Sequence, residues 1–266
     1  MKSFQYFTAT ITTLGLFCGA AAVAQEDSAG AAAQANNPLA DITAFNIQNY
    51  YIGDLTGFPD ASGNQLVLRF AKPISIGESD WLIRASLPFN DLDFGGAAPG
   101  ISGVGDLDIF AAYQFDTGSP ATSFAIGPQV VFPTGKKEVS SEQWQLGLAN
   151  VYFNAASPKV QYGYLAIYRA GVGDTNGNER VSVGAFQPFL FYQLGGGWYT
   201  GTAPIWSYNF KSDSYAVPLG VRFGKVTPRG KTVYNVFVEP QYTVADRGVG
   251  LPEWQVFAGL NMQFLK

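Results

Sequence analysis

The sequence predicts an all-β protein that closes as an antiparallel transmembrane β-barrel, and three observations lead to this fold class. Apolar residues recur at every second position from about Thr43 onward, which is the period of a strand with one apolar face. Turn-forming residues interrupt this pattern at short intervals. Charged residues make up only 14% of the chain, against about 25% in soluble domains. Such a composition suits strands that face lipid.

The first 24 residues have the features of a secretory signal peptide. Lys2 supplies a positive charge, an apolar stretch follows it, and Ala22-Val23-Ala24 forms an A-x-A cleavage site. The mature chain is expected to start at Gln25, so that Cys18, the single cysteine, is removed. Residues 25–40 are predicted to be a flexible leader that is rich in Ala, Gln and Asn. Residues 41–266 are predicted to form the barrel.

The last predicted strand, residues 253–264, shows the clearest alternation. One face carries Trp254, Val256, Ala258, Leu260, Met262 and Phe264, and the other carries Gln255, Gly259, Asn261 and Gln263, with Phe257 as the exception. Residues 80–89, 106–115 and 231–245 alternate in the same way. Counted in this way, the chain contains about twelve such segments, each long enough for a tilted membrane strand. They are centred near positions 48, 69, 85, 110, 127, 149, 164, 187, 204, 221, 238 and 259, and the eighth and ninth have no clear phase.

The connections between these segments alternate between short and long, with one short exception at 211–214. Outer-membrane barrels have short periplasmic turns and long outer loops, so an even barrel with both termini in the periplasm is expected. Aromatic residues are predicted near both ends of the strands, which is typical of membrane interfaces. A soluble β-sandwich is the alternative, because it also alternates, but it needs no aromatic residues at both strand ends.

Several segments in a fixed order carry a family resemblance. They are 81–88 (WLIRASLP), 105–108 (GDLD), 127–135 (GPQVVFPTG), 187–190 (QPFL), 197–199 (GWY), 217–220 (VPLG) and 224–226 (GKV). In these segments the chain resembles the outer-membrane transporter-like family named for the MetA pathway of phenol degradation, some of whose members are labelled neuromedin U. The likeness runs from about Leu39 to the C-terminus. It implies an outer-membrane barrel that passes small compounds, with aromatic compounds as candidates.

The composition excludes several functions. The chain has no histidine, which removes Ser-His and Asp-His hydrolysis and His-ligated metals. A net charge of -4 without a basic cluster argues against nucleic acid as a partner. Asp106 and Asp108 are two apart on one strand face and could act as an acid–base pair, but a wet lumen or a salt bridge explains them more simply. No enzyme activity, metal or cofactor is expected.

Charged residues in the polar phase of the strands are predicted to line the lumen, since each would cost roughly 2–4 kcal/mol in the bilayer midplane. Arg69, Arg84 and Arg222 are expected in the periplasmic half, Asp106 and Asp108 higher, and Glu239 near mid-height. Arg222 and Glu239 lie on neighbouring strands and are expected to pair. These charges could form a selective constriction or a salt-bridged plug. Phe237 and Phe257 could line a path for aromatic solutes or merely fill space.

Two functions remain open on this sequence. The first is a passive channel for small solutes in the bacterial outer membrane. The second is a non-transporting surface or scaffold barrel with a filled lumen. The expected partners are outer-membrane lipid, a small-molecule solute and the barrel-assembly machinery during biogenesis.

Overall fold

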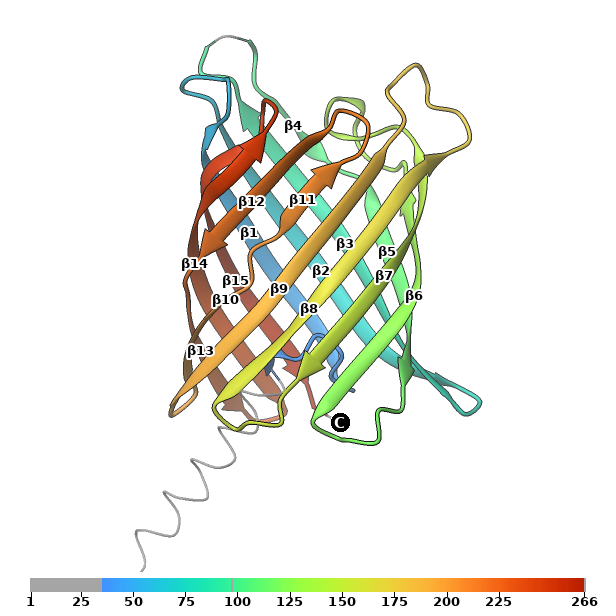
Figure 1. The fold of residues 1–266 in the computed structure, drawn as a ribbon, viewed down its shortest axis with the longest axis vertical. Coiled ribbons are helices and arrows are strands. Elements are labelled where there is room, and N and C mark those ends of the chain that lie inside the picture. Colours follow the sequence, from blue (N-terminus) through green and yellow to red (C-terminus); the bar gives the residue numbers. More distant parts are fainter. Residues whose placement is uncertain (1–34, 97, 266) are drawn as a thin grey trace, which may run out of the picture.

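A computed structural model describes residues 35–96 and 98–265, which form a closed antiparallel β-barrel (Figure 1). The predicted fold class is confirmed. The predicted signal peptide and residues 25–34 of the predicted leader lie outside the described residues. Within the described part of the chain, no helix is long and apolar enough to cross a membrane.

Fifteen strand segments build twelve barrel strands, as predicted. The segments are β1 (Thr43–Leu55), β2 (Ser62–Ile76), β3 (Ser79–Asp93), β4 (Ile101–Val104), β5 (Leu107–Phe115), β6 (Thr122–Phe132), β7 (Trp144–Asn154), β8 (Val160–Val172), β9 (Ser182–Gly195), β10 (Trp198–Thr202), β11 (Trp206–Asn209), β12 (Ser214–Gly220), β13 (Arg222–Arg229), β14 (Thr232–Arg247) and β15 (Pro252–Phe264). One 3₁₀ turn, η1 (Lys137–Val139), lies between β6 and β7. Each of the pairs β4–β5, β10–β11 and β12–β13 is one interrupted barrel strand, and pairing of β1 with β15 closes the barrel.

The two predicted segments centred near 204 and 221 contain interruptions at their centres. Pairing of β10 with β13 ends at Gly201, and pairing of β11 with β12 begins at Ser207. Pro204 lies between these two ladders and has no backbone N–H to donate. The barrel wall therefore lacks part of its backbone ladder at mid-height, and side chains must satisfy the backbone there.

The alternation predicted for β15 is confirmed. Gln255 and Asn261 point into the barrel, where they bond to Gln241 (2.5 Å) and Gln48 (2.9 Å). Their neighbour Phe257 is also inside and is 2% exposed. Trp254 and Val256 lie on the other face. A shift of one residue would place these amides in hydrocarbon, which fixes the register.

Both ends of the described chain lie at the same end of the barrel, where Thr43 of β1 pairs with Phe264 of β15 (Figure 1). We call this end the turn end, because it carries short connections such as 77–78 and 230–231, and the opposite end the loop end. Between β9 and β10, Gly195, Gly196 and Gly197 all have positive φ (96°, 56° and 80°). This conformation favours glycine, and these three residues form a turn.

Aromatic side chains on the outer face gather in two girdles. At the turn end, Trp81, Tyr113 and Phe115 contact one another in a row, with ring centroids 5.4 and 4.7 Å apart. At the loop end, Phe132 lies 5.0 Å from Trp144, and Tyr51 lies 5.9 Å from Trp254. Two aromatic girdles flanking an apolar band are the outer surface of a membrane-spanning barrel.

Residues 35–40, the last six of the predicted flexible leader, fold across the lumen at the turn end instead of extending from it. Ala35 joins an apolar cluster with Phe191, Tyr199 and Phe257, whereas Leu39 joins a second cluster with Phe110 and others. Leu39 is only 2% exposed. The polar composition of the leader predicted disorder, but a single Leu flanked by small residues provides enough apolar surface to dock inside the barrel.

Candidate functional site

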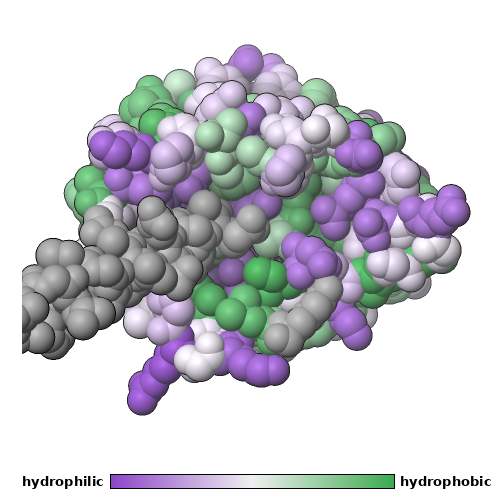
Figure 2. Space-filling model, turned by 90° about the horizontal axis from the view of Figure 1, so that it is seen from below, coloured by the Kyte–Doolittle hydropathy of each residue, from purple (hydrophilic) through white to green (hydrophobic). Residues whose placement is uncertain are grey.

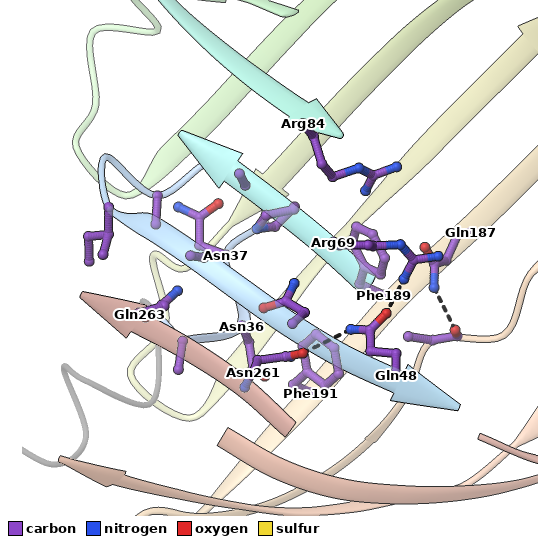
Figure 3. Close-up of a pocket in the computed structure, with 18 of the residues that line it drawn as sticks. Asn36, Asn37, Gln48, Arg69, Arg84, Gln187, Phe189, Phe191, Asn261 and Gln263 are labelled. Carbon is purple, nitrogen blue, oxygen red and sulfur yellow. Dashed lines mark hydrogen bonds between the residues drawn. The ribbon is translucent and has the colours of Figure 1, made fainter. Parts of the chain in front are cut away.

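The interior of the barrel contains two adjoining cavities. The turn-side cavity, of about 140 Å³, lies between residues 35–40 and the inner wall (Figure 3). The loop-side cavity, of about 520 Å³, lies toward the loop end. Arg69, Arg84 and Gln187 line both cavities. These three residues therefore lie where the two cavities adjoin, and we call this place the junction.

The segment 35–40 is held in place by side-chain amides. Asn235 of β14 donates to the carbonyl of Ala35 (3.4 Å) and to Oδ1 of Asn36 (3.1 Å). Asn37 donates to the hydroxyl of Ser123 (3.3 Å) on β6, so polar contacts tie the segment to distant parts of the wall. Figure 2 shows apolar side chains gathered at the centre of the turn end with polar residues around them. The turn end is thus narrowed by the chain itself.

The predicted pair of Arg222 and Glu239 forms, and both side chains are buried. Arg222 Nε donates to Glu239 Oε2 over 2.7 Å, with side-chain exposures of 7% and 0%. The second carboxylate oxygen of Glu239 accepts the backbone amide of Ala203 (3.0 Å) and the side-chain amide of Gln241 (2.9 Å). Glu239 therefore supplies a hydrogen-bond acceptor where the wall is interrupted between β10 and β11, and its role is structural.

The predicted lumen aromatics Phe237 and Phe257 pack tightly around Arg222. Its guanidinium lies 4.0 Å from the ring centre of Phe237 and 5.2 Å from that of Phe257. Tyr50 stacks on the other side of Phe257 at 4.1 Å. Phe257 borders the turn-side cavity, but both rings are nearly inaccessible, at 4% and 2% exposure. In this structure these rings fill space, which was one of the two interpretations that the sequence left open.

Arg69 and Arg84 lie at the junction on the neighbouring strands β2 and β3. Arg69 donates from Nη1 to Oε1 of Gln48, which itself donates to Asn261 (Figure 3). Arg84 lies over the ring of Phe110, with its guanidinium carbon 4.3 Å from the ring centre. None of the ion pairs formed within residues 35–96 and 98–265 includes either arginine. The Nε donors of both are buried and lack a partner in this part of the chain.

The two aspartates of the predicted acidic pair, Asp106 and Asp108, have different partners. Asp106 lies in the break between β4 and β5, and its carboxylate accepts hydrogen bonds from the backbone amides of Gly135 (3.1 Å) and Ser141 (3.0 Å) in the loop between β6 and β7. Asp108 faces the loop-side cavity, where Gln129 donates to both of its oxygens (2.9 and 2.8 Å). The two carboxylates therefore do not form a common acid–base site. Both aspartates line the loop-side cavity, but Asp106 is bound by the loop, whereas Asp108 is bound by Gln129 and lies near Arg169.

One charged lumen residue, Arg169, was not predicted from the sequence. Arg169 of β8 lies 3.4 Å from Asp108 and lines the loop-side cavity. The sequence could have shown this, because Arg169 is an even number of residues from Gln161 and therefore lies on the same inner face of the strand. The apolar residues Leu165 and Ile167 lie between them on that face and obscured the alternation of polar and apolar residues. With Arg169 included, two of the four lumen arginines have an acidic partner within the described residues, and the other two form the junction.

The charges of the lumen are therefore unevenly compensated. Arg222 is neutralised by Glu239 and Arg169 by Asp108. Arg69 and Arg84 lie together and form no ion pair in the described chain, and Asp108 attracts Arg84 from beyond ion-pair distance. Low-dielectric walls focus the field of such charges. The arrangement produces a positive potential at the narrow junction between the two cavities.

No protein-family model matches the sequence, and no curated protein matches it either. Among solved structures, the fold is similar to that of the COG4313 outer membrane channel from Pseudomonas putida F1, with a TM-score of 0.64 at 14% identity over 84% of this chain and 96% of that chain. It is also similar to the NanC porin, with a TM-score of 0.52 at 11% identity over 84% of this chain and 100% of that chain. At these identities the likeness establishes the fold, which is that of a bacterial outer-membrane β-barrel.

Proposed function

We propose that the protein is a passive channel for small solutes across the bacterial outer membrane, and that it has no enzyme activity. The observation that carries this proposal is the pair of adjoining cavities, which share Arg69, Arg84 and Gln187 and lie inside a closed barrel. A charged constriction inside a closed barrel is how membrane channels select solutes. The likeness to outer-membrane channels supports this function, as does the resemblance to the transporter-like family named for phenol degradation.

The proposal includes three partners: outer-membrane lipid around the apolar outer face, a small solute in the lumen, and the barrel-assembly machinery during biogenesis. Aromatic compounds are candidate solutes because of the family resemblance. Phe237 and Phe257 contribute little to such a path, since they are almost completely buried. A route for aromatic solutes would instead use the loop-side cavity.

A second function is favoured by one observation, the segment 35–40 that crosses the turn end. If this segment stays in place, the barrel is a closed scaffold that presents its loops. Purified full-length mature protein in planar bilayers separates the two functions. Stepwise single-channel currents support the channel, whereas no current from protein that migrates as a folded barrel on unheated gels supports the scaffold. Heat-unfolded protein from the same preparation is the control.

A further inference from the structure

The loop-side cavity has two chemically different walls. Its polar wall comes from β2, β3 and β5 and includes Arg69, Arg84, Ser86 and Asp108. Its opposite wall comes from β8, β9 and the residues before β11. It is mainly apolar, with Leu165, Ile167, Val183, Ala185 and Ile205, and it also carries Arg169 and Gln187. A cavity with two arginines on one wall and a mainly apolar opposite wall is complementary to a solute that has an anionic group and an apolar body.

The two arginines of the polar wall, Arg69 and Arg84, have unused hydrogen-bond donors. Arg84 is positioned by the ring of Phe110 beneath it, and this contact leaves the N–H groups at the edge of the guanidinium available. Arg69 is positioned by neutral Gln48, which cannot compensate its charge. Charged groups withdrawn from water are normally paired, and these two are unpaired within the described residues. An incoming anion would supply the missing partner.

Among anions, the geometry favours a carboxylate. A guanidinium presents a planar fork of donors that matches the two oxygens of a carboxylate. Arg69 and Arg84 come from adjacent strands, in which Arg69 pairs with Ser86 and Arg84 pairs with Ala71. The two forks therefore lie diagonally on one wall of the junction, where a single carboxylate can be received by both.

We propose that Arg69 and Arg84 form a binding site for small organic carboxylates with an apolar body, which packs against the wall around Val183. This inference rests on the proposed channel function and names its solute class. The carboxylate binds at the junction between the two cavities, and the apolar body occupies the loop-side cavity. The pairing of Asp108 with Arg169 and its hydrogen bonds from Gln129 reduce its repulsion of the bound carboxylate.

Benzoate is a suitable probe, with acetate, benzamide and chloride as comparisons. Acetate keeps the carboxylate without the ring, and benzamide keeps the ring without the charge. Titration calorimetry on the detergent-solubilised mature protein is expected to show benzoate binding more tightly than any of the three. Equal binding of benzamide would overturn the role of the arginines. Equal binding of chloride or acetate would overturn the selection of an apolar carboxylate.

Substitutions on each wall of the loop-side cavity test which side chains bind benzoate. Arg69→Gln combined with Arg84→Gln should weaken benzoate binding by at least about tenfold, because charge-assisted hydrogen bonds are lost. Arg180→Gln is the control for the Arg84→Gln single variant, because it removes the same charge from an arginine that lines neither cavity and is held by the carbonyls of Gly171 and Gly173. Val183→Thr keeps the shape of the apolar wall but adds a hydroxyl, and it should reduce the preference for benzoate over acetate. An equal loss in Arg180→Gln and Arg84→Gln would mean that only the general positive charge of the protein matters.

Bilayer currents distinguish failure of this site from failure of the channel. Conducting protein whose anion preference and benzoate block survive in the double Gln variant would overturn the site and leave the channel intact. Protein that binds benzoate through the two arginines but carries no current would support the site and overturn the channel. The anion preference is measured at low salt, where the charges of the arginines are screened least.

Discussion

The carboxylate of Glu239 accepts a hydrogen bond of 3.0 Å from the backbone amide of Ala203. This contact replaces a rung of the β-ladder where the wall between β10 and β11 is interrupted. On the other side of the same gap, Gln187 donates to the carbonyl of Ala203 (2.9 Å). Side chains from β9 and β14 thus satisfy the backbone that neighbouring strands leave unpaired, as a lipid-surrounded wall requires.

Glu239→Ala is expected to destabilise the barrel by about 3–5 kcal/mol, because it leaves Arg222 buried without its counter-charge. It also leaves the amide of Ala203 without an acceptor. Unfolding in urea, followed by tryptophan fluorescence in detergent, measures the change. The control is Glu253→Ala, which removes an exposed carboxylate from β15. Equal stability of the two variants would show that the wall does not depend on Glu239.

Leu39→Asn is expected to increase single-channel conductance by releasing the segment 35–40 from the lumen. Removal of a buried leucine costs at least about 2 kcal/mol, and Leu39 is the largest apolar anchor of this short segment. Leu265→Asn, at the half-exposed end of the chain beyond β15, serves as the matched control. Unchanged conductance in Leu39→Asn would mean that solutes pass without displacement of the segment.

Asp106→Asn is expected to loosen the loop 133–143. The carboxylate accepts three hydrogen bonds from Gly135 and Ser141, and an amide cannot accept them equally well. Trypsin added to intact cells should then cleave after Lys136 or Lys137 faster, by about tenfold or more if one charge-assisted bond is lost. Asp108→Asn should leave the cleavage rate unchanged, because Asp108 does not contact this loop. Protection of the loop in every variant would argue against its exposure at the cell surface.

Adjacent cysteines on β3 should report the two faces of the wall. Ser86→Cys lies on the loop-side cavity, whereas Leu87→Cys lies on the outer, lipid-facing side. A negatively charged, membrane-impermeant thiosulfonate should label the first faster in native membranes. The sequence has no cysteine besides Cys18, which lies in the predicted signal peptide. Faster labelling of Leu87→Cys would contradict the assignment of the faces.

The sequence by itself determined which face of each regular strand points into the lumen. A period of two is a local property, so Gln255 and Asn261 could be assigned to the interior, and Arg222 could be matched with Glu239 on the neighbouring strand. The number of strands, the two aromatic girdles and the absence of histidine chemistry were equally readable. All of them depend on composition or on residues close together along the chain or across one strand pair.

Only the tertiary structure decided which groups meet across the lumen. Arg169 and Asp108 lie on β8 and β5, which are separated by two strands, and closure of the barrel brings them within 3.4 Å. Leu39 docks between strands that no local pattern connects with it, and Asp106 turns to the loop because the strand breaks beside it. Periodicity fixes the direction of a side chain, but its partner depends on the curvature and closure of the whole wall. For this reason Arg69 and Arg84 could be placed in the lumen from sequence, whereas their lack of an acidic partner in the described chain became visible only in the folded barrel.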